Sequence, residues 1–375
     1  MTTRRWTELP AEVPIGRYDE RDIPFSRVRL KPGSAEYNSY YAMRPENRAV
    51  DDAIRALPGL LSAEGALAEP LLFASPEGSF FLTEALQRAV DGPVAGTRRD
   101  LGPSRMAAYL KSLAGYFGAR SVGVTELRPY HMYSHIGRDL SRYGEPILFE
   151  PGYAVAFTVE MDLRMTRAAP RAPAVMESGR QYVEAARIAV QLAAAVRAMG
   201  HPARAHIDGS YRVVGPLVAR DAGLGEIGRM GLLMTPRLGP RVRLGVVTTS
   251  LELVPDRSTP DETVIDFCER CRKCADNCPA GAIPEGGRPD GPEGVRRWRI
   301  DHDACFRYWN VVGTDCARCV AVCPYSHADN LFHNVVRWGV RRSALFRGAA
   351  VRLDDVFYGR RPAPAEPPGW ARFKE

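Results

Sequence analysis

The stretch FCERCRKCADNCPAG, residues 267–281, places four cysteines within eleven positions, with a proline directly after the last. Its spacing is Cys-x2-Cys-x2-Cys-x3-Cys-Pro, and a second run, ending in Cys323-Pro324, has the spacing Cys-x10-Cys-x2-Cys-x3-Cys-Pro. All eight cysteines of the chain lie in these two runs. Such a concentration of thiols indicates metal ligation, and it differs from the disulfide framework of a secreted protein.

The ligand pairing follows from the spacing. In the bacterial ferredoxin run, three closely spaced thiolates bind one [4Fe–4S] cluster and the fourth binds the neighbouring cluster. We therefore expect two clusters, cluster 1 on Cys268, Cys271, Cys274 and Cys323, and cluster 2 on Cys278, Cys305, Cys316 and Cys319. Two structural zinc sites are the alternative, but zinc ribbons usually pair two Cys-x2-Cys units.

Composition describes an ordinary globular protein of 375 residues, with 45% hydrophobic and 25% charged residues, long enough for two or three domains. The net charge of +7 comes mostly from arginines that form no block, so we expect no DNA binding. No apolar run approaches the roughly 20 residues that span a bilayer. Arg4 and Arg5 are followed by no apolar segment, so we expect no export signal and a cytoplasmic location.

Residues 116–253 have the pattern of a mixed α/β core. Strands are predicted over residues 121–127, 153–161, 202–208 and 242–253. An Ala-rich helix is predicted over residues 178–200, with a capping box formed by Ser178 and Gln181.

Three further regions surround this core. Residues 1–115 form a Pro-rich segment that we expect to cover the core, with short helices within 46–61 and 104–119. Residues 254–327 form the ferredoxin-like domain, and residues 328–375 form a tail with enough aromatic side chains to pack back on the body.

A glycine-rich stretch, AGLGEIGRMG at residues 222–231, matches the spacing of a dinucleotide-binding fingerprint at Gly223, Gly225 and Gly228. That fingerprint follows a strand and precedes an acidic residue about 20 positions on. Here the preceding residues are predicted to be helical and the acidic residue is missing. The match alone is therefore weak evidence for NAD.

Several segments resemble the corrinoid-dependent reductive dehalogenases. The most specific are DAGLGEIGRMGLLMTPRLGPRVRL (221–244) and the two cysteine runs; the segments at 17–27, 126–138 and 182–208 also resemble that family. The resemblance implies a nitroreductase-like core that holds a base-off cobalamin or related corrinoid beside the clusters. The chain has no Asp-x-His-x-x-Gly motif, so no protein histidine ligand to cobalt is expected.

The resemblance also implies roles for individual residues. Tyr182 matches the family's proton-donating tyrosine, and Arg241 matches the assisting cation best, with Arg229 as the alternative. Asp208 stands where the family has an amide, and a carboxylate can only accept hydrogen bonds unless it is protonated. Residues expected around the cofactor are Gly223, Gly225, Gly228, His206 and Tyr133.

Two histidines, His131 and His135, lie four positions apart. No further ligands accompany them, so ordinary packing or pocket lining is expected in place of a metal site.

The resemblance implies an oxidoreductase that replaces the halogen of a small organohalide with hydrogen. Electrons would come from an external ferredoxin, flavodoxin or reductase and pass through the clusters to cobalt. Two alternatives stay open. One is an epoxyqueuosine-reductase-like enzyme that acts on transfer RNA, since that related family carries an aspartate near the position of Asp208. The other is an iron–sulfur electron-transfer subunit without a corrinoid.

Overall fold

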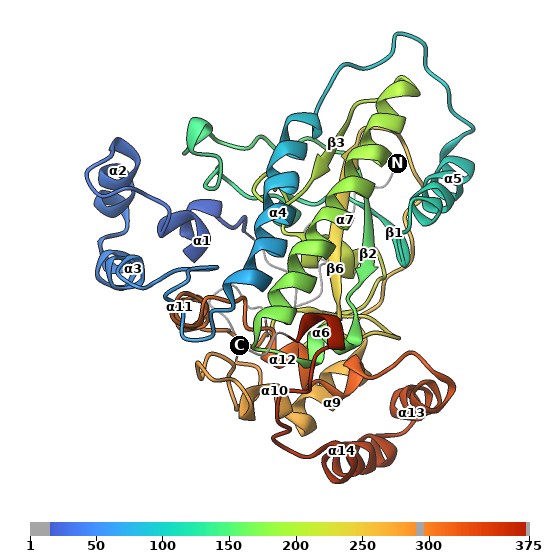
Figure 1. The fold of residues 1–375 in the computed structure, drawn as a ribbon. Helices are drawn as coiled ribbons and strands as arrows, with labels where there is room; N and C mark the ends of the chain where they lie inside the picture. The colour runs from blue at the N-terminus through green and yellow to red at the C-terminus, as the bar shows by residue number, and fades with distance from the viewer. Residues whose placement is uncertain (1–15, 290–295, 373–375) are drawn as a thin grey trace.

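The computed structural model describes residues 16–289 and 296–372 (Figure 1). Within these ranges four strands form an antiparallel sheet in the order β1-β2-β6-β3. They are β1 (Ser121–Glu126), β2 (Tyr153–Glu160), β3 (Ala203–His206) and β6 (Val242–Thr249). The four predicted strands and the mixed α/β class are confirmed.

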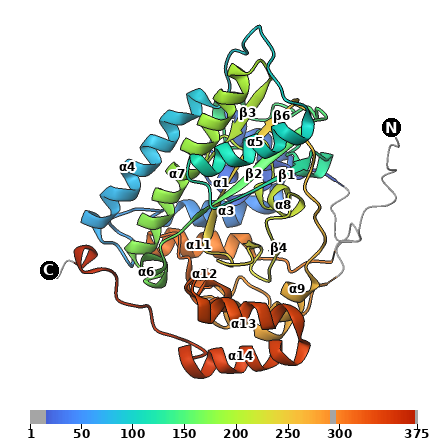
Figure 2. The same ribbon diagram turned by 90° about the vertical axis from the view of Figure 1, so that its right-hand side faces the viewer.

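Both faces of the sheet are covered, which explains why β2 is buried along almost its whole length. Val155 and Phe157 pack with helix α7 (Ala172–Ala198), whereas Ala154 and Ala156 pack with helix α8 (Gly215–Asp221) on the other face. Figure 2 shows α8 and α7 on opposite sides of the strands. On β6, Val247 contacts the α7 side and Val246 the α8 side, so odd-numbered residues of this strand face α7.

Helix α7 begins earlier than the sequence pattern predicts. It begins at Ala172, with a proline in its first turn, and Ser178 lies within it. The predicted capping box at Ser178 is therefore wrong. The Ser178 hydroxyl is buried and bonds to Asp315, a partner 137 residues away that local sequence does not reveal.

The N-terminal helices contact both the core and the cysteine region. Helix α4 (Pro70–Leu86) runs along α7, and α5 (Pro103–Tyr116) packs on β1 (Figure 1). Gly179 allows the close approach of α4, because a Cβ there would lie 3.2 Å from Pro76. The short helices α1 (Pro24–Arg27) and α3 (Arg48–Arg55) contact the cysteine region, and α2 (Ala35–Met43) lies between them in sequence.

Within its described residues, the cysteine region contains four short α-helices: α9 (Glu262–Cys271), α10 (Lys273–Asp276), α11 (His302–Val312) and α12 (Arg318–Ala321). The residues that follow Cys271 and Cys316, Arg272 and Ala317, both have a φ of 52°. The two Cys-x2-Cys turns therefore share a left-handed residue after their first cysteine, although Cys316 is also left-handed, with a φ of 57°, and Cys271 ends helix α9.

Two helices follow the cysteine region, α13 (Leu331–Arg342) and α14 (Ala344–Tyr358), which pack on each other and on α9. They lie at the lower end of the molecule in both views (Figures 1 and 2). A small hairpin of β4 (Glu226–Ile227) and β5 (Leu233–Met234) joins the core to this region. In the part of the chain described here, no helix is long and apolar enough to cross a membrane.

Candidate active site and iron–sulfur centre

None of the eight cysteines forms a disulfide, and most are buried. Burial raises the pKa of Cys323 well above its usual value, and the neighbouring thiols that add to this rise are those of Cys268, Cys271 and Cys274. Because the unliganded thiols favour the protonated form, bound metal ions must supply the charge that stabilises them as thiolates.

The remaining cysteines form a second group. Burial also raises the pKa of Cys316, to about 12, and its thiol neighbours are Cys305 and Cys278. The same two thiols and Cys316 lie near Cys319, together with Cys274 of the first group. The two neighbourhoods have the members of the two predicted ligand sets, and the ligand assignment itself stays a prediction. Within residues 16–289 and 296–372, no three His, Cys, Asp or Glu side chains converge on a single metal-ion position.

Arg229 lies beside the first group of thiols. It is 1% exposed, its Nε donates to the Cys268 carbonyl at 3.1 Å, and its Nη1 donates to the carbonyls of Pro284 and Gly286. The guanidinium also lies over the Trp298 ring, 4.8 Å from its centroid. The structure therefore places this alternative catalytic cation at the cysteines, where it contributes positive charge.

The glycine-rich stretch, residues 222–231, also lies beside the first group of cysteines. The turn follows helix α8, as the sequence predicts, and a Cβ on Gly228 would lie 3.4 Å from Cys268 Sγ and 2.7 Å from the Met234 side chain. A Cβ on Gly225 would lie 2.2 Å from the Met234 carbonyl oxygen. These glycines therefore permit close packing between the β4–β5 hairpin and the first group of cysteines.

We expect Arg229→Gln to lower the midpoint potential of one cluster, because a buried cation favours the more negative, reduced state. A unit charge about 7 Å away, at an effective dielectric constant of about 20, contributes about 2 kcal/mol, on the order of 100 mV for one electron. Redox titration followed by electron paramagnetic resonance measures this shift. Arg229→Lys keeps the charge and should retain most of the potential; an equal shift in both variants would contradict the electrostatic explanation.

The second centre surrounds Tyr182, in the middle of helix α7. The Arg243 guanidinium lies over the Tyr182 ring, 5.0 Å from its centroid. Burial raises the pKa of Tyr182, and the positive charge of Arg243 partly opposes this rise. The phenol is therefore protonated at neutral pH, as a proton donor must be.

A residue of the cysteine region, Asp315, positions the Arg243 side chain. Arg243 forms an ion pair with Asp315 at 3.0 Å, and both side chains bond to the Ser178 hydroxyl. Asp315 directly precedes Cys316. One polar network thus connects the tyrosine to the second group of cysteines.

A second ion pair, Arg138–Asp208 at 2.7 Å, lies close to the same tyrosine. The Asp208 charge raises the pKa of Arg138 although burial opposes the charged form. Tyr211 completes the group, and burial raises its pKa well above the usual value, with Asp208 and Tyr182 adding to the rise. The carboxylate that replaces the expected amide is therefore compensated by an arginine, which supplies the missing donors.

Two buried donors in this site lack partners. Among the residues that the structure describes, neither Arg138 Nε nor Arg243 Nε has a hydrogen-bond partner. Unsatisfied buried donors are costly and rare in folded proteins. Their position beside Tyr182 fits a site that receives a hydrogen-bond acceptor from a bound molecule.

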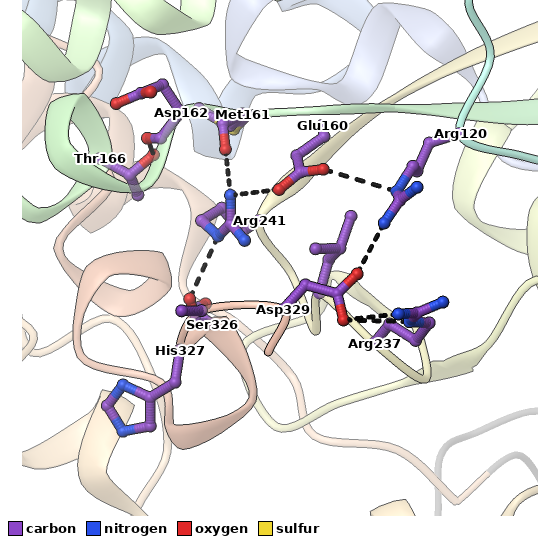
Figure 3. A network of polar contacts seen from close by, with 12 residues as sticks. Arg120, Glu160, Met161, Asp162, Thr166, Arg237, Arg241, Ser326, His327 and Asp329 are labelled. Carbon is purple, nitrogen blue, oxygen red and sulfur yellow. Dashed lines mark hydrogen bonds and ion pairs between the residues drawn. The ribbon is translucent and has the colours of Figure 1, made fainter. Parts of the chain in front are cut away.

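Arg241 belongs to a different polar network, with Glu160, Met161 and Ser326 (Figure 3). Its guanidinium is 2% exposed and bonds to Glu160 at 3.0 Å, to the Ser326 carbonyl at 3.1 Å and to the Met161 carbonyl. Arg241 precedes strand β6 and lies beside the end of β2, whereas Arg243 lies within β6 on the face toward α7. The cation beside the tyrosine is thus the second arginine of GPRVRL.

The remaining predicted residues have structural partners. His206 bonds through Nε2 to Thr248 and through Nδ1 to the Arg212 backbone; His131 bonds to Asp221 and to the Arg128 backbone. His135 contacts Ser134 and Asp19. Burial raises the pKa of Tyr133, which has Arg138 among its charged neighbours. Sequence reasoning missed Arg138, Arg243 and Tyr211, although Arg138 and Arg243 lie in segments that it singled out.

The structure thus joins an α/β core with a tyrosine–arginine site to a region with two four-cysteine groups. Residues 267–327 match the family model described as "4Fe-4S dicluster domain", so this region binds iron–sulfur clusters. A tetrachloroethene reductive dehalogenase from Desulfitobacterium hafniense is 34% identical over 219 residues, covering 56% of this chain and 39% of that protein.

The chain is also similar to solved structures of reductive dehalogenases. The catabolic reductive dehalogenase NpRdhA in complex with 3-bromo-4-hydroxybenzoic acid is 27% identical with a TM-score of 0.69, covering 80% of this chain and 45% of that chain. A structure described as suggesting a mechanism for B12-dependent dehalogenation has the same identity and TM-score and covers 82% of this chain and 46% of that chain. The chain is thus a relative of the reductive dehalogenases and spans about half the length of these relatives or less.

One further match is named for a different enzymatic activity. An epoxyqueuosine reductase from Bacillus cereus is 31% identical over 123 residues, covering 31% of this chain and 30% of that protein.

Proposed function

We propose that this protein is a corrinoid- and iron–sulfur-dependent reductase that removes halogen from a small organohalide. One observation supports this most directly. Tyr182, a protonated phenol, lies under Arg243, which is held by Asp315 next to Cys316. A proton source and an iron–sulfur domain therefore meet in one network, as a reductive step that consumes both protons and electrons requires.

The proposed reaction takes up two electrons and one proton, breaks the carbon–halogen bond, forms a carbon–hydrogen bond and releases halide. When bound, a corrinoid would supply the low-valent cobalt chemistry that cleaves the carbon–halogen bond. The protein's own residues supply the proton. Tyr182 Oη holds it, and the positive charge of Arg243 stabilises the phenolate left after transfer.

The residues present fit an acceptor-rich group beside Tyr182, because Arg138 Nε and Arg243 Nε are free to donate to it. We infer that neither His206 nor His131 is a ligand of the corrinoid cobalt. Both ring nitrogens of His206 and of His131 are engaged by other partners. Two clusters, on the cysteine sets given above, complete the proposed cofactor set.

Anaerobic purification, reconstitution with iron, sulfide and cobalamin, and metal analysis test the proposal. We expect about eight iron atoms, from two [4Fe–4S] clusters, and about one cobalt per chain. Halide release should follow from an organohalide probe, with tetrachloroethene and 3-bromo-4-hydroxybenzoic acid as the two probes that the relatives indicate. Full iron content without cobalt uptake would favour the electron-transfer subunit and contradict the corrinoid assignment.

A second candidate is epoxyqueuosine reduction in transfer RNA, and the observation that favours it is the carboxylate of Asp208 at the active site. Gel-shift assays with transfer RNA and queuosine measurements in a deletion strain distinguish the two. Transfer-RNA binding together with loss of queuosine would favour this second candidate over dehalogenation.

A further inference from the structure

The inner face of helix α13 covers the first group of cysteines. Val340 lies in one apolar cluster with Cys268, Cys271, Cys274 and Cys323, and Val336 packs against it. Arg337 donates from the same helix to the carbonyls of Tyr325 and His327, just after the last cysteine. An α-helix with its side chains is about 10 Å across. The outer face of α13 therefore lies about one helix diameter from the predicted cluster 1.

The outer face of α13 exposes large apolar side chains. Leu331 is 82% exposed, Phe332 64%, Val335 56% and Trp338 58%. Single exposed apolar residues are common, but four on one helix form a contiguous patch of the kind that binds partners.

The patch adjoins strong positive charge. A shallow depression beside Trp338 is lined by four arginines and no carboxylate; its lining residues are Pro236, Arg237, Asn334, Arg337, Trp338, Arg341 and Arg342. The Arg342 guanidinium lies over the Trp338 ring, 4.2 Å from its centroid. Arg341 forms a long ion pair with Asp261, with 4.0 Å between Nη2 and Oδ2. Arg237 is paired with Asp329. Within residues 16–289 and 296–372, Arg341 has only this long ion pair with Asp261 and Arg342 has no carboxylate partner, so this rim favours an acidic partner.

We propose that this patch, the outer face of α13 with Arg341 and Arg342, is the docking surface for a small acidic one-electron carrier protein that reduces cluster 1. The proposal rests on the proposed function in one respect, that the clusters are loaded and reduced from outside. An apolar centre with a charged rim suits a transient redox complex, in which charge speeds the encounter. A basic amphipathic helix also suits an anionic membrane, but the contact of its inner face with the cysteines favours the carrier.

Charge reversal tests the docking surface. In the reconstituted protein, Arg341→Glu with Arg342→Glu should lower the second-order rate of cluster reduction by reduced flavodoxin about 10-fold or more at low ionic strength. The difference should shrink at high salt. Reduction by dithionite, which needs no protein docking, should be unchanged. Stopped-flow absorbance of the clusters measures both rates.

A matched control reverses two arginines elsewhere. Arg98 and Arg99 are exposed and lie in the loop between α4 and α5, at the opposite end of the molecule from α13 (Figures 1 and 2). Arg98→Glu with Arg99→Glu changes the net charge equally and should leave the flavodoxin rate near that of the parent. Equal loss in both pairs would show a net-charge effect and overturn the proposal. Slower reduction by dithionite in the α13 pair would show damage to the cluster domain, and it too would overturn it.

A membrane surface or a second copy of this chain bound at α13 would each give a different result. Co-sedimentation with phosphatidylglycerol vesicles that the α13 substitutions abolish, with an unchanged flavodoxin rate, would identify a membrane surface. Self-association that the same substitutions abolish would identify a second copy. Either result overturns the carrier proposal. Normal cluster reduction by flavodoxin without halide release would contradict the proposed function alone.

Discussion

Tyr182→Phe is expected to lower the rate of halide release by about 10²- to 10⁴-fold, the usual contribution of a positioned general acid. The substitution removes the phenolic proton and leaves the ring that lies under Arg243. Steady-state turnover with a chemical reductant measures the effect, and iron and cobalt contents should match those of the parent. Unchanged turnover would show that another group delivers the proton.

The two arginines of GPRVRL provide matched variants. Arg243 lowers the pKa of Tyr182 against the larger effect of burial, so Arg243→Met should raise this pKa further. Turnover requires the protonated phenol and is lost as the pH rises through its pKa. The alkaline limb of the Arg243→Met profile should therefore move to higher pH, with reduced turnover throughout.

Arg241→Met should behave differently. Its guanidinium bonds to Glu160 and to two backbone carbonyls (Figure 3), whereas Arg243 lies over the Tyr182 ring. We expect reduced thermal stability, because buried acceptors lose their donor, and an alkaline limb at the parent pH. A shift of the limb in Arg241→Met, and none in Arg243→Met, would reverse the assignment made from the structure.

Cys278→Ala is expected to remove one cluster and abolish turnover, while the other cluster stays. Cys278 lies in the first run, yet its thiol is a neighbour of Cys305, Cys316 and Cys319. Iron content should fall to about half of the roughly eight atoms of two clusters. Electron paramagnetic resonance should show a single, uncoupled reduced cluster.

Cys323→Ala is the reciprocal variant. Its thiol lies in the second run but neighbours Cys268, Cys271 and Cys274, so the other cluster should be lost. Because the two clusters have different surroundings, their spectra and potentials identify which one remains. Loss of the same cluster in both variants would contradict the pairing.

The sequence predicted the four strands of the core because each alternates or is apolar over its own length. It predicted the helix that carries Tyr182 for a similar reason, although the true start at Ala172 lies before the apparent cap at Ser178. That serine resembles a cap in local sequence, but its partner, Asp315, comes from the cysteine region. Local pattern contains no signal for such a contact.

The sequence by itself predicted the two sets of cysteines, since ligand spacing on a short loop constrains which thiols reach one cluster. It also singled out Tyr182 and Asp208. Only the tertiary structure decided which arginine side chains lie beside these two residues. Arg138 reaches Asp208 across 70 residues of chain, and Arg243 reaches Tyr182 because strand β6 turns this residue toward α7. Arginine side chains form their ion pairs through space, so the choice between Arg241, Arg229 and Arg243 depends on the direction in which each backbone segment points its side chain.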